Sequence, residues 1–188
     1  MIRAMQCLAL AFLGGALLFA GCIFGPSRFQ GALGYSHDKV WLRYATPYQK
    51  GNFYRVGPLP GGWERLRTNA RAIAFYHPAY RATIYTDAFC GGSFSDAPDE
   101  VLIGGMVGGL QELKTLHQEP LMLDGRGALR RRMHAALDGV PLELDAMVVK
   151  KDDCLFDFLA VAPFPADPAV RADFVAFYEG FHFGGGPF

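Results

Sequence analysis

Turn signals divide the residues from Glu119 to Ala162 into four segments of alternating apolar and polar side chains. Asp124-Gly125 and Asp138-Gly139 are two-residue hairpin signals, because glycine accepts the positive φ that a type I′ turn requires. Lys150-Lys151-Asp152-Asp153 supplies a third turn. The spacing therefore predicts a four-stranded antiparallel meander over residues 119–162.

The turn at Asp138-Gly139 also sets the register of the two strands beside it. Apolar residues then oppose one another on one face and complementary charges do so on the other, which supports this register. A turn at Lys151-Asp152 makes the charged face apolar one strand later, so we expect both faces of the sheet to be covered. The expected pairs are Leu137–Val140, Ala135–Leu142 and Met133–Leu144, then His134–Glu143 and Arg132–Asp145, then Met147–Phe156 and Asp145–Phe158.

Helical patterns flank the meander on both sides. The first helix is expected to begin at Asp96 as N-cap, with Pro98 in its first turn, and to end at about Leu116. The second begins at Asp167-Pro168, and its apolar residues recur at helical spacing. Those residues are Val170, Phe174, Phe177, Tyr178 and Phe181.

Four glycines lie inside the first expected helix, at positions 104, 105, 108 and 109. Each costs up to about 1 kcal/mol relative to alanine in a helix interior, so some packing gain must offset them. We expect them to let the helix approach the protein's own sheet closely. Close approach to a partner is the alternative.

A second hairpin is predicted ahead of these elements. Ile73–Tyr76 and Arg81–Ala88 flank His77-Pro78-Ala79, and the second arm contains Thr83-Ile84-Tyr85-Thr86, which favours a strand. Together these elements predict an α+β fold in which an antiparallel β-sheet meander lies between helices.

Composition and charge fit a single folded domain. The chain has 188 residues, of which 51% are hydrophobic and 14% aromatic, so one core of ordinary size can be buried. The 18 basic and 18 acidic residues give a formal net charge of zero. No overall field then favours nucleic acid, and we do not expect nucleic acid as a partner.

Residues 1–21 have the pattern of a removable export signal. Arg3 gives the start a positive charge, and an apolar stretch runs from Cys7 to Phe19. That stretch is shorter than the roughly 20 apolar residues of a membrane-spanning helix. It ends in Leu18-Phe19-Ala20-Gly21-Cys22, which resembles the lipobox of bacterial lipoproteins.

This resemblance implies that the signal is removed and that Cys22 carries the lipid that holds the mature chain on a membrane. Ile23 follows the cysteine in place of Asp, which by the enterobacterial sorting rule implies the outer membrane, facing the periplasm. Few aliphatic residues and several glycines indicate a tether over 22–50. The domain is expected over 51–183 and a flexible tail over 184–188.

The order of elements resembles the Mog1/PsbP-like α/β/α sandwich over roughly Phe53 to Phe183. The resemblance is carried by Gly57-Pro58-Leu59-Pro60-Gly61-Gly62-Trp63, by the hairpin Leu123-Asp124-Gly125, and by a final Phe-rich strand followed by a helix. Members of this family are mostly non-catalytic accessory or binding proteins. The resemblance therefore implies an accessory or binding role.

Two cysteines remain in the exported domain once Cys7 leaves with the signal and Cys22 takes lipid. An even pair in an exported protein favours a disulfide between Cys90 and Cys154. Two unpaired buried thiols are one alternative. A nucleophilic Cys90, which needs a histidine partner, is the other.

The predicted register also places charged residues near one another. Arg131 lies beside Ala146, as does Asp157 on the next strand, which predicts an Arg131–Asp157 ion pair. A ligand-anchoring Arg131 is the alternative. No two histidines have the spacing of a helical metal pair, so we expect neither a metal nor a cofactor. The histidines are His37, His77, His117, His134 and His182.

The sequence thus favours a non-enzymatic, membrane-anchored lipoprotein of the cell envelope. Its expected role is an accessory or binding one towards a partner protein or an apolar ligand. The first alternative is a structural component of an envelope assembly. The second is a Cys-dependent hydrolase built around Cys90.

Overall fold

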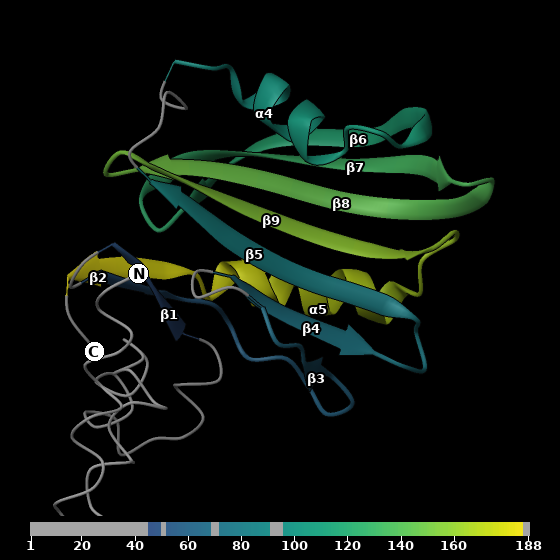
Figure 1. The fold of residues 1–188 in the computed structure, drawn as a ribbon, viewed down its shortest axis with the longest axis horizontal. Helices are drawn as coiled ribbons and strands as arrows, with labels where there is room; N and C mark the ends of the chain where they lie inside the picture. The colour runs from purple at the N-terminus through teal and green to yellow at the C-terminus, as the bar shows by residue number, and fades with distance from the viewer. Residues whose placement is uncertain (1–44, 50–51, 69–71, 91–95, 186–188) are drawn as a thin grey trace, which may run out of the picture. The chain divides into compact units, whose positions relative to one another are not determined.

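A computed structural model describes residues 45–49, 52–68, 72–90 and 96–185 (Figure 1). Its elements are β1 Ala45–Gln49, β2 Asn52–Arg55, β3 Glu64–Arg65, β4 Ile73–His77, β5 Ala82–Cys90, α4 Asp99–Met106, β6 Gln111–Leu123, β7 Arg126–Leu137, β8 Val140–Lys151, β9 Cys154–Pro163, α5 Pro168–Glu179 and β10 His182–Gly185. The signal, the lipobox and Cys22 lie outside these residues. Neither described helix is long and apolar enough to cross a bilayer.

Seven strands form the main antiparallel sheet, in the order β3-β4-β5-β9-β8-β7-β6. Helix α5 packs on one face, over the larger hydrophobic core, and α4 packs on the other, over a smaller core (Figure 1). The predicted α+β sandwich with a sheet between helices is therefore confirmed. The hairpin predicted from Ile73 to Ala88 is also present, as β4 and β5.

The meander is confirmed, and the register between β7 and β8 follows the prediction at all five pairs around Asp138-Gly139. Asp138 and Gly139 have φ values of 50° and 78°, the left-handed conformation that a tight hairpin turn requires. Met133, Ala135 and Leu144 on one face are buried beneath α4, whereas Leu137 and Val140 beside the turn are exposed. Charged residues on the other face point towards α5.

The next turn differs from the prediction. Asp152 and Asp153, with φ values of 52° and 59°, form the turn in place of Lys151-Asp152. Phe158 therefore lies opposite Met147, and Phe156 lies opposite Val149, each displaced by two residues from the expected pairing. Because side chains alternate with a period of two, this slip keeps every residue on its predicted face.

Helix α4 is shorter than predicted. It spans Asp99–Met106 with Pro98 as N-cap, and Gly109, at a φ of 91°, follows its end. Residues from Gln111 onward form β6, because the second glycine pair ends the helix and pairing with β7 satisfies the backbone beyond it. A Cβ added at Gly104 or Gly105 would meet nothing within 4 Å, so the expected close approach to the sheet is wrong.

Helix α5 begins as predicted but ends at Glu179, so Phe181 lies just beyond it. The side chain of Asp167 accepts a hydrogen bond from the backbone N–H of Ala169 at 2.8 Å and caps the helix. Phe174 and Phe177 are fully buried in the larger core, where each aromatic side chain contributes about 2 kcal/mol or more. Gly57 crosses the helix so closely that a Cβ there would collide with its backbone, and its N–H donates to the carbonyl of Phe177 at 2.8 Å.

Two predicted boundaries need correction. Ala45–Gln49, assigned to the tether, forms β1 and pairs with β2. His182–Gly185, which includes the first two residues of the expected tail, forms β10 and pairs with the other edge of β2. The pairing of backbone groups across this three-stranded sheet makes both segments part of the folded domain.

Candidate functional site

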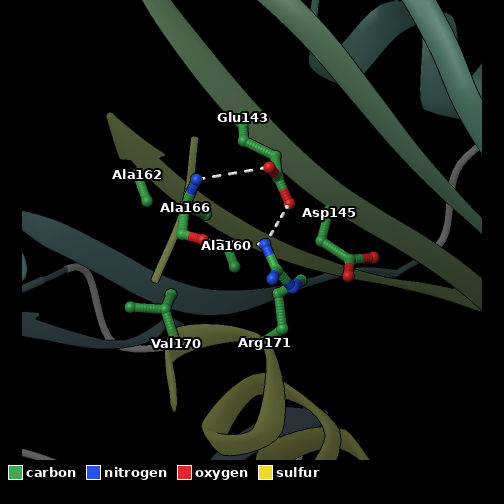
Figure 2. A pocket seen from close by; sticks show the side chains of 7 residues that line it. All are labelled: Glu143, Asp145, Ala160, Ala162, Ala166, Val170 and Arg171. Atoms are coloured by element: carbon green, nitrogen blue, oxygen red, sulfur yellow. Dashed lines mark hydrogen bonds and ion pairs between the residues drawn. The ribbon is translucent and has the colours of Figure 1, made fainter. Parts of the chain in front are cut away.

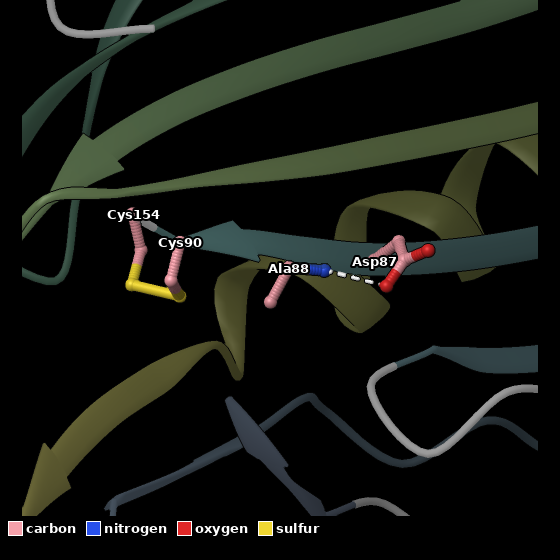
Figure 3. The surroundings of a disulfide bond; sticks show 4 residues. All are labelled: Asp87, Ala88, Cys90 and Cys154. Carbon is pink, nitrogen blue, oxygen red and sulfur yellow. Dashed lines mark hydrogen bonds between the residues drawn. A yellow bond between two sulfur atoms is a disulfide. The ribbon is translucent and has the colours of Figure 1, made fainter. Parts of the chain in front are cut away.

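The two cysteines of the domain form a disulfide between adjacent strands. Cys90, at the end of β5, lies directly opposite Cys154, at the start of β9, with their Cα atoms 4.1 Å apart (Figure 3). The bond closes a loop of 64 residues. By chain entropy alone such a bridge stabilises the fold by about 4 kcal/mol. Because its sulfur is engaged in this bond, Cys90 is not a free thiol nucleophile, which removes the basis of a Cys-dependent hydrolase.

The expected ion pair between Arg131 and Asp157 is not formed among the residues that the structure describes. The two-residue slip at the third turn places Leu159, and not Asp157, beside Ala146. Arg131 donates instead to the side-chain oxygen of Gln118 at 2.7 Å, on the neighbouring strand β6.

Asp157 is nearly buried on the α4 side of the sheet, with 9% of its surface exposed. It lies directly opposite Asp87 of β5, and its Oδ1 atom has no hydrogen-bond partner among the residues that the structure describes. Burial, and then the nearby charge of Asp87, raise the pKa of Asp157 from 3.8 to about 7. Asp87 itself accepts a hydrogen bond from the N–H of Ala88 at 2.8 Å (Figure 3).

Arg130 is the centre of a charged network on the opposite face. Its guanidinium binds Asp145 through two hydrogen bonds of 2.8 and 2.6 Å, a two-point geometry that suits carboxylates. It also donates to Glu119 at 3.1 Å and to the hydroxyl of Tyr178 at 3.2 Å. The hydrogen bond with Asp145 raises the pKa of Arg130 further above its usual range. This network joins three strands of the sheet to α5.

A second ion pair lies nearby, between Glu143 of β8 and Arg171 of α5, at 3.1 Å. Glu143 also accepts from the N–H of Ala166 at 3.3 Å, and Arg171 donates to the carbonyl of Ala166 at 2.8 Å (Figure 2). The cavity beside them has a volume of about 10 Å³, lined by residues that include Asp145 and Val170. Such a volume holds about one water molecule, so it is not a ligand pocket.

A larger groove opens between β6 and the end of α5. It has a volume of about 330 Å³, which is within the range of small-ligand pockets. Its lining combines carboxylates, a tyrosine and apolar side chains. The lining residues are Glu119, Leu121, Met122, Leu123, Asp124, Tyr178 and Glu179.

Contacts across the β6–β7 turn hold this groove in place. The side chain of Asp124 lies 3.0 Å from the ring of His182 and accepts from the N–H of Phe183 at 3.2 Å. Both partners belong to β10, so the turn is tied to the smaller sheet. At the other end, the bond between Arg130 and Tyr178 fixes α5 against the strands. The groove is therefore set by three separate parts of the fold.

The four described histidines lie apart, each in a different setting. His77 stacks on Tyr80 at 4.1 Å between ring centroids, and His117 lies 3.5 Å from Glu119. His134 lies opposite Glu143 as predicted, but Glu143 pairs with Arg171, and the histidine packs on the ring of Phe164. Within the described part of the chain, no group of three or more potential ligands is arranged to hold a metal ion.

Sequence reasoning found part of this surface and missed the rest. The alternation along β7 correctly sends Arg130 and Arg131 to opposite faces. Glu119 could have been found as a partner of Arg130, because the hairpin signal at Asp124-Gly125 places the two residues opposite one another. Tyr178 could not be foreseen, because it comes from α5, whose packing is not set by the meander. Leu121 and Leu123, which lie on the same face of the strand beside the turn, were the available signal for the groove.

No protein family's sequence profile and no curated protein sequence matches this chain. Solved structures do resemble it. Cyanobacterial PsbP (CyanoP) from Synechocystis sp. PCC 6803 aligns with 79% of this chain and 98% of its own length, at 13% identity and a TM-score of 0.55. LpqN of Mycobacterium tuberculosis, described as involved in cell envelope biogenesis, aligns with 69% of this chain and 83% of its own, at 14% identity and a TM-score of 0.50.

A protein from Bacteroides thetaiotaomicron VPI-5482 aligns with 74% of this chain at 10% identity and a TM-score of 0.50. The aligned region spans about half of that protein, 47% of its length. At such low identities these likenesses bear on the fold. They agree with the PsbP-like sandwich expected from the sequence.

Proposed function

We propose that this protein is a lipid-anchored, non-enzymatic accessory protein of the bacterial cell envelope, whose domain binds a partner protein or an apolar ligand. The observation that carries the binding role is the groove between β6 and α5. Its volume of about 330 Å³ and its mixed lining of apolar side chains and carboxylates suit recognition of another molecule.

The location in the envelope has separate support. Cys22 follows a signal-like segment and resembles a lipidation site, and each buried acyl methylene contributes about 0.8 kcal/mol to membrane binding. The Cys90–Cys154 disulfide suits an oxidising compartment such as the periplasm. The fold is shared with LpqN, whose description refers to cell envelope biogenesis. We propose attachment to the outer membrane, with the domain facing the periplasm.

Photo-crosslinking in intact bacterial cells tests the binding role. A photoreactive residue at Glu179, which is exposed at the rim of the groove, is compared with one at Val140, which is 53% exposed at a distant turn. We expect the first position alone to yield one reproducible adduct with an envelope protein or a lipid-like ligand. Adducts that are absent, or identical at the two positions, would contradict a binding role for the groove.

A further inference from the structure

Three basic side chains gather on one face of the sheet, where β6 begins beside the end of β7. Arg132 and His134 alternate along β7 on the face that carries α5. Arg130, two residues earlier on the same strand, identifies this face because its side chain reaches Tyr178 of α5. Lys114 of β6 lies directly opposite His134. The three side chains therefore lie on the same side of two neighbouring strands.

Arg132 has no counter-charge within the described protein. The register places it opposite Asp145, but both oxygens of Asp145 accept from Arg130, at 2.8 and 2.6 Å. The side chain of Arg132 makes no hydrogen bond or ion pair with any residue that the structure describes, and its Nε atom is buried. A partly buried charge without a partner is unfavourable, because it has lost part of its water. Folding alone therefore does not explain an arginine at this position.

His134 lacks a polar partner in the same way. Glu143, directly opposite, binds Arg171 at 3.1 Å. The ring of His134 is held instead by Phe164, with 4.4 Å between the ring centroids. Of the buried polar side-chain atoms that have no partner in the described part of the chain, the two nitrogens are Nε2 of His134 and Nε of Arg132. Neighbouring nitrogens of this kind indicate an acceptor supplied by another molecule.

This cluster is open to solutes along β6. Lys114 is exposed, on the terminal strand of the seven-stranded sheet, and the other two members are partly exposed. Lys114 makes no ion pair with any described residue. Glu119, further along β6 on the same face, is already engaged by Arg130 and His117, at 3.1 and 3.5 Å. The positive charges of the cluster are therefore available to an anion from outside.

We infer that Lys114, Arg132 and His134 bind the phosphate group of a ligand. A phosphate carries up to two negative charges and several acceptor oxygens, so it can engage an arginine, a lysine and an imidazole at once. A carboxylate has one charge and two oxygens, which an arginine alone would satisfy. The Glu119–Arg130 pair separates this cluster from the groove between β6 and α5. The inference therefore does not depend on the role proposed for the groove.

Isothermal titration calorimetry on the full-length protein in a nonionic detergent tests the inference with three ligands. Inorganic phosphate carries the group alone, and glycerol 3-phosphate carries it as in the headgroup of phosphatidic acid. The acidic peptide Gly-Ser-Glu-Leu-Glu-Ser-Gly carries carboxylates only. We expect both phosphates to bind, with an affinity that falls as salt is added, and the peptide to bind at least about tenfold more weakly. Tighter binding of glycerol 3-phosphate supports a headgroup-like ligand, and equal binding supports free phosphate.

Substitutions locate the binding. Arg132→Gln should weaken phosphate binding about tenfold or more, because it removes the charge and the two-point donor. Lys114→Gln, at an exposed position, should weaken it about threefold through the loss of one charge. Arg126→Gln removes the same charge at the exposed start of β7, and it should leave the affinity within about twofold.

Urea unfolding separates a binding role from a structural one. Without phosphate, Arg132→Gln should be at least as stable as the unmodified protein, because this arginine has no partner to lose. A loss of stability as large as that of Arg130→Gln would show a structural role and overturn the inference. Unchanged phosphate binding in both Arg132→Gln and Lys114→Gln would also overturn it, as would an acidic peptide that binds as tightly as phosphate.

Discussion

At the scale of single residues, each face of the sheet buries a carboxylate, and the two carboxylates have opposite hydrogen-bonding environments. Asp145 is 4% exposed and receives two hydrogen bonds from Arg130. Asp157 is 9% exposed and lies opposite Asp87, and one of its oxygens has no hydrogen-bond partner in the described part of the chain. Burial favours the protonated form of Asp157, with a pKa of about 7.

This raised pKa predicts a distinct pH dependence for Asp157. Between pH 4 and about 7 the folded protein holds a proton that the unfolded chain has released, so this carboxyl lowers the free energy of unfolding as pH rises. The loss between about pH 4.5 and 7.5 is about 2 to 4 kcal/mol. Asp157→Asn should remove it. Urea unfolding at both pH values measures the stability of each variant relative to the unmodified protein. From the lower to the higher pH this relative stability should rise by the same amount for Asp157→Asn. It should not change for the control Asp138→Asn, at an exposed turn.

Removal of Arg130 should destabilise the fold. Arg130→Met leaves Asp145 buried without its partner, which costs about 3 to 5 kcal/mol of unfolding free energy at neutral pH. Urea denaturation at neutral pH measures this cost. The exposed neighbour Arg126 provides the control Arg126→Met, and an equal effect of the two substitutions would contradict a structural role for the Arg130 network.

At the scale of elements, regular hairpins could be predicted from sequence, and the exceptions have local causes. The turn at Asp138-Gly139 fixed its register because glycine prefers the required conformation. The next turn contains no glycine, and Asp152 and Asp153 both adopt positive φ instead, which sequence signals did not distinguish from Lys151-Asp152. That slip of two residues also separated Arg131 from Asp157.

The first helix shows a different limit. Apolar spacing continued past Met106, yet Gly108 and Gly109 end α4 and β6 begins at Gln111. The stability gained by extending the sheet comes from pairing with β7. The helical periodicity of the segment itself carries no information on that pairing. The long exposed edge that results is what places Glu119–Asp124 beside α5 to form the groove.

The glycines of this segment provide a test of the account of α4. Gly104→Ala should stabilise the protein by about 0.5 to 1 kcal/mol, because the site is helical and open to solvent. Gly109→Ala should destabilise it by about 1 kcal/mol, because its φ of 91° disfavours a side chain. Thermal unfolding of both variants measures the signs. Destabilisation by Gly104→Ala would indicate that the helix face is packed against something after all.

At the scale of the whole molecule, the fold class and the covering of both sheet faces were predictable, because alternation in the meander and the two helical patterns agree with one another. The ends of the domain were not. Ala45–Gln49 and His182–Gly185 are weak signals by themselves and become strands only by pairing on either side of β2. The groove also requires residues from the middle and from the end of the domain, so local patterns could not assemble it.

Membrane attachment through Cys22 is the central claim, and mass spectrometry of the mature N-terminus in bacterial membranes tests it most directly. The account predicts a chain that begins at Cys22 and carries acyl groups, recovered in the membrane fraction, while a Cys22→Ser variant lacks the acyl mass. A chain that begins at Met1, or an unmodified Cys22 in the mature protein, would contradict it.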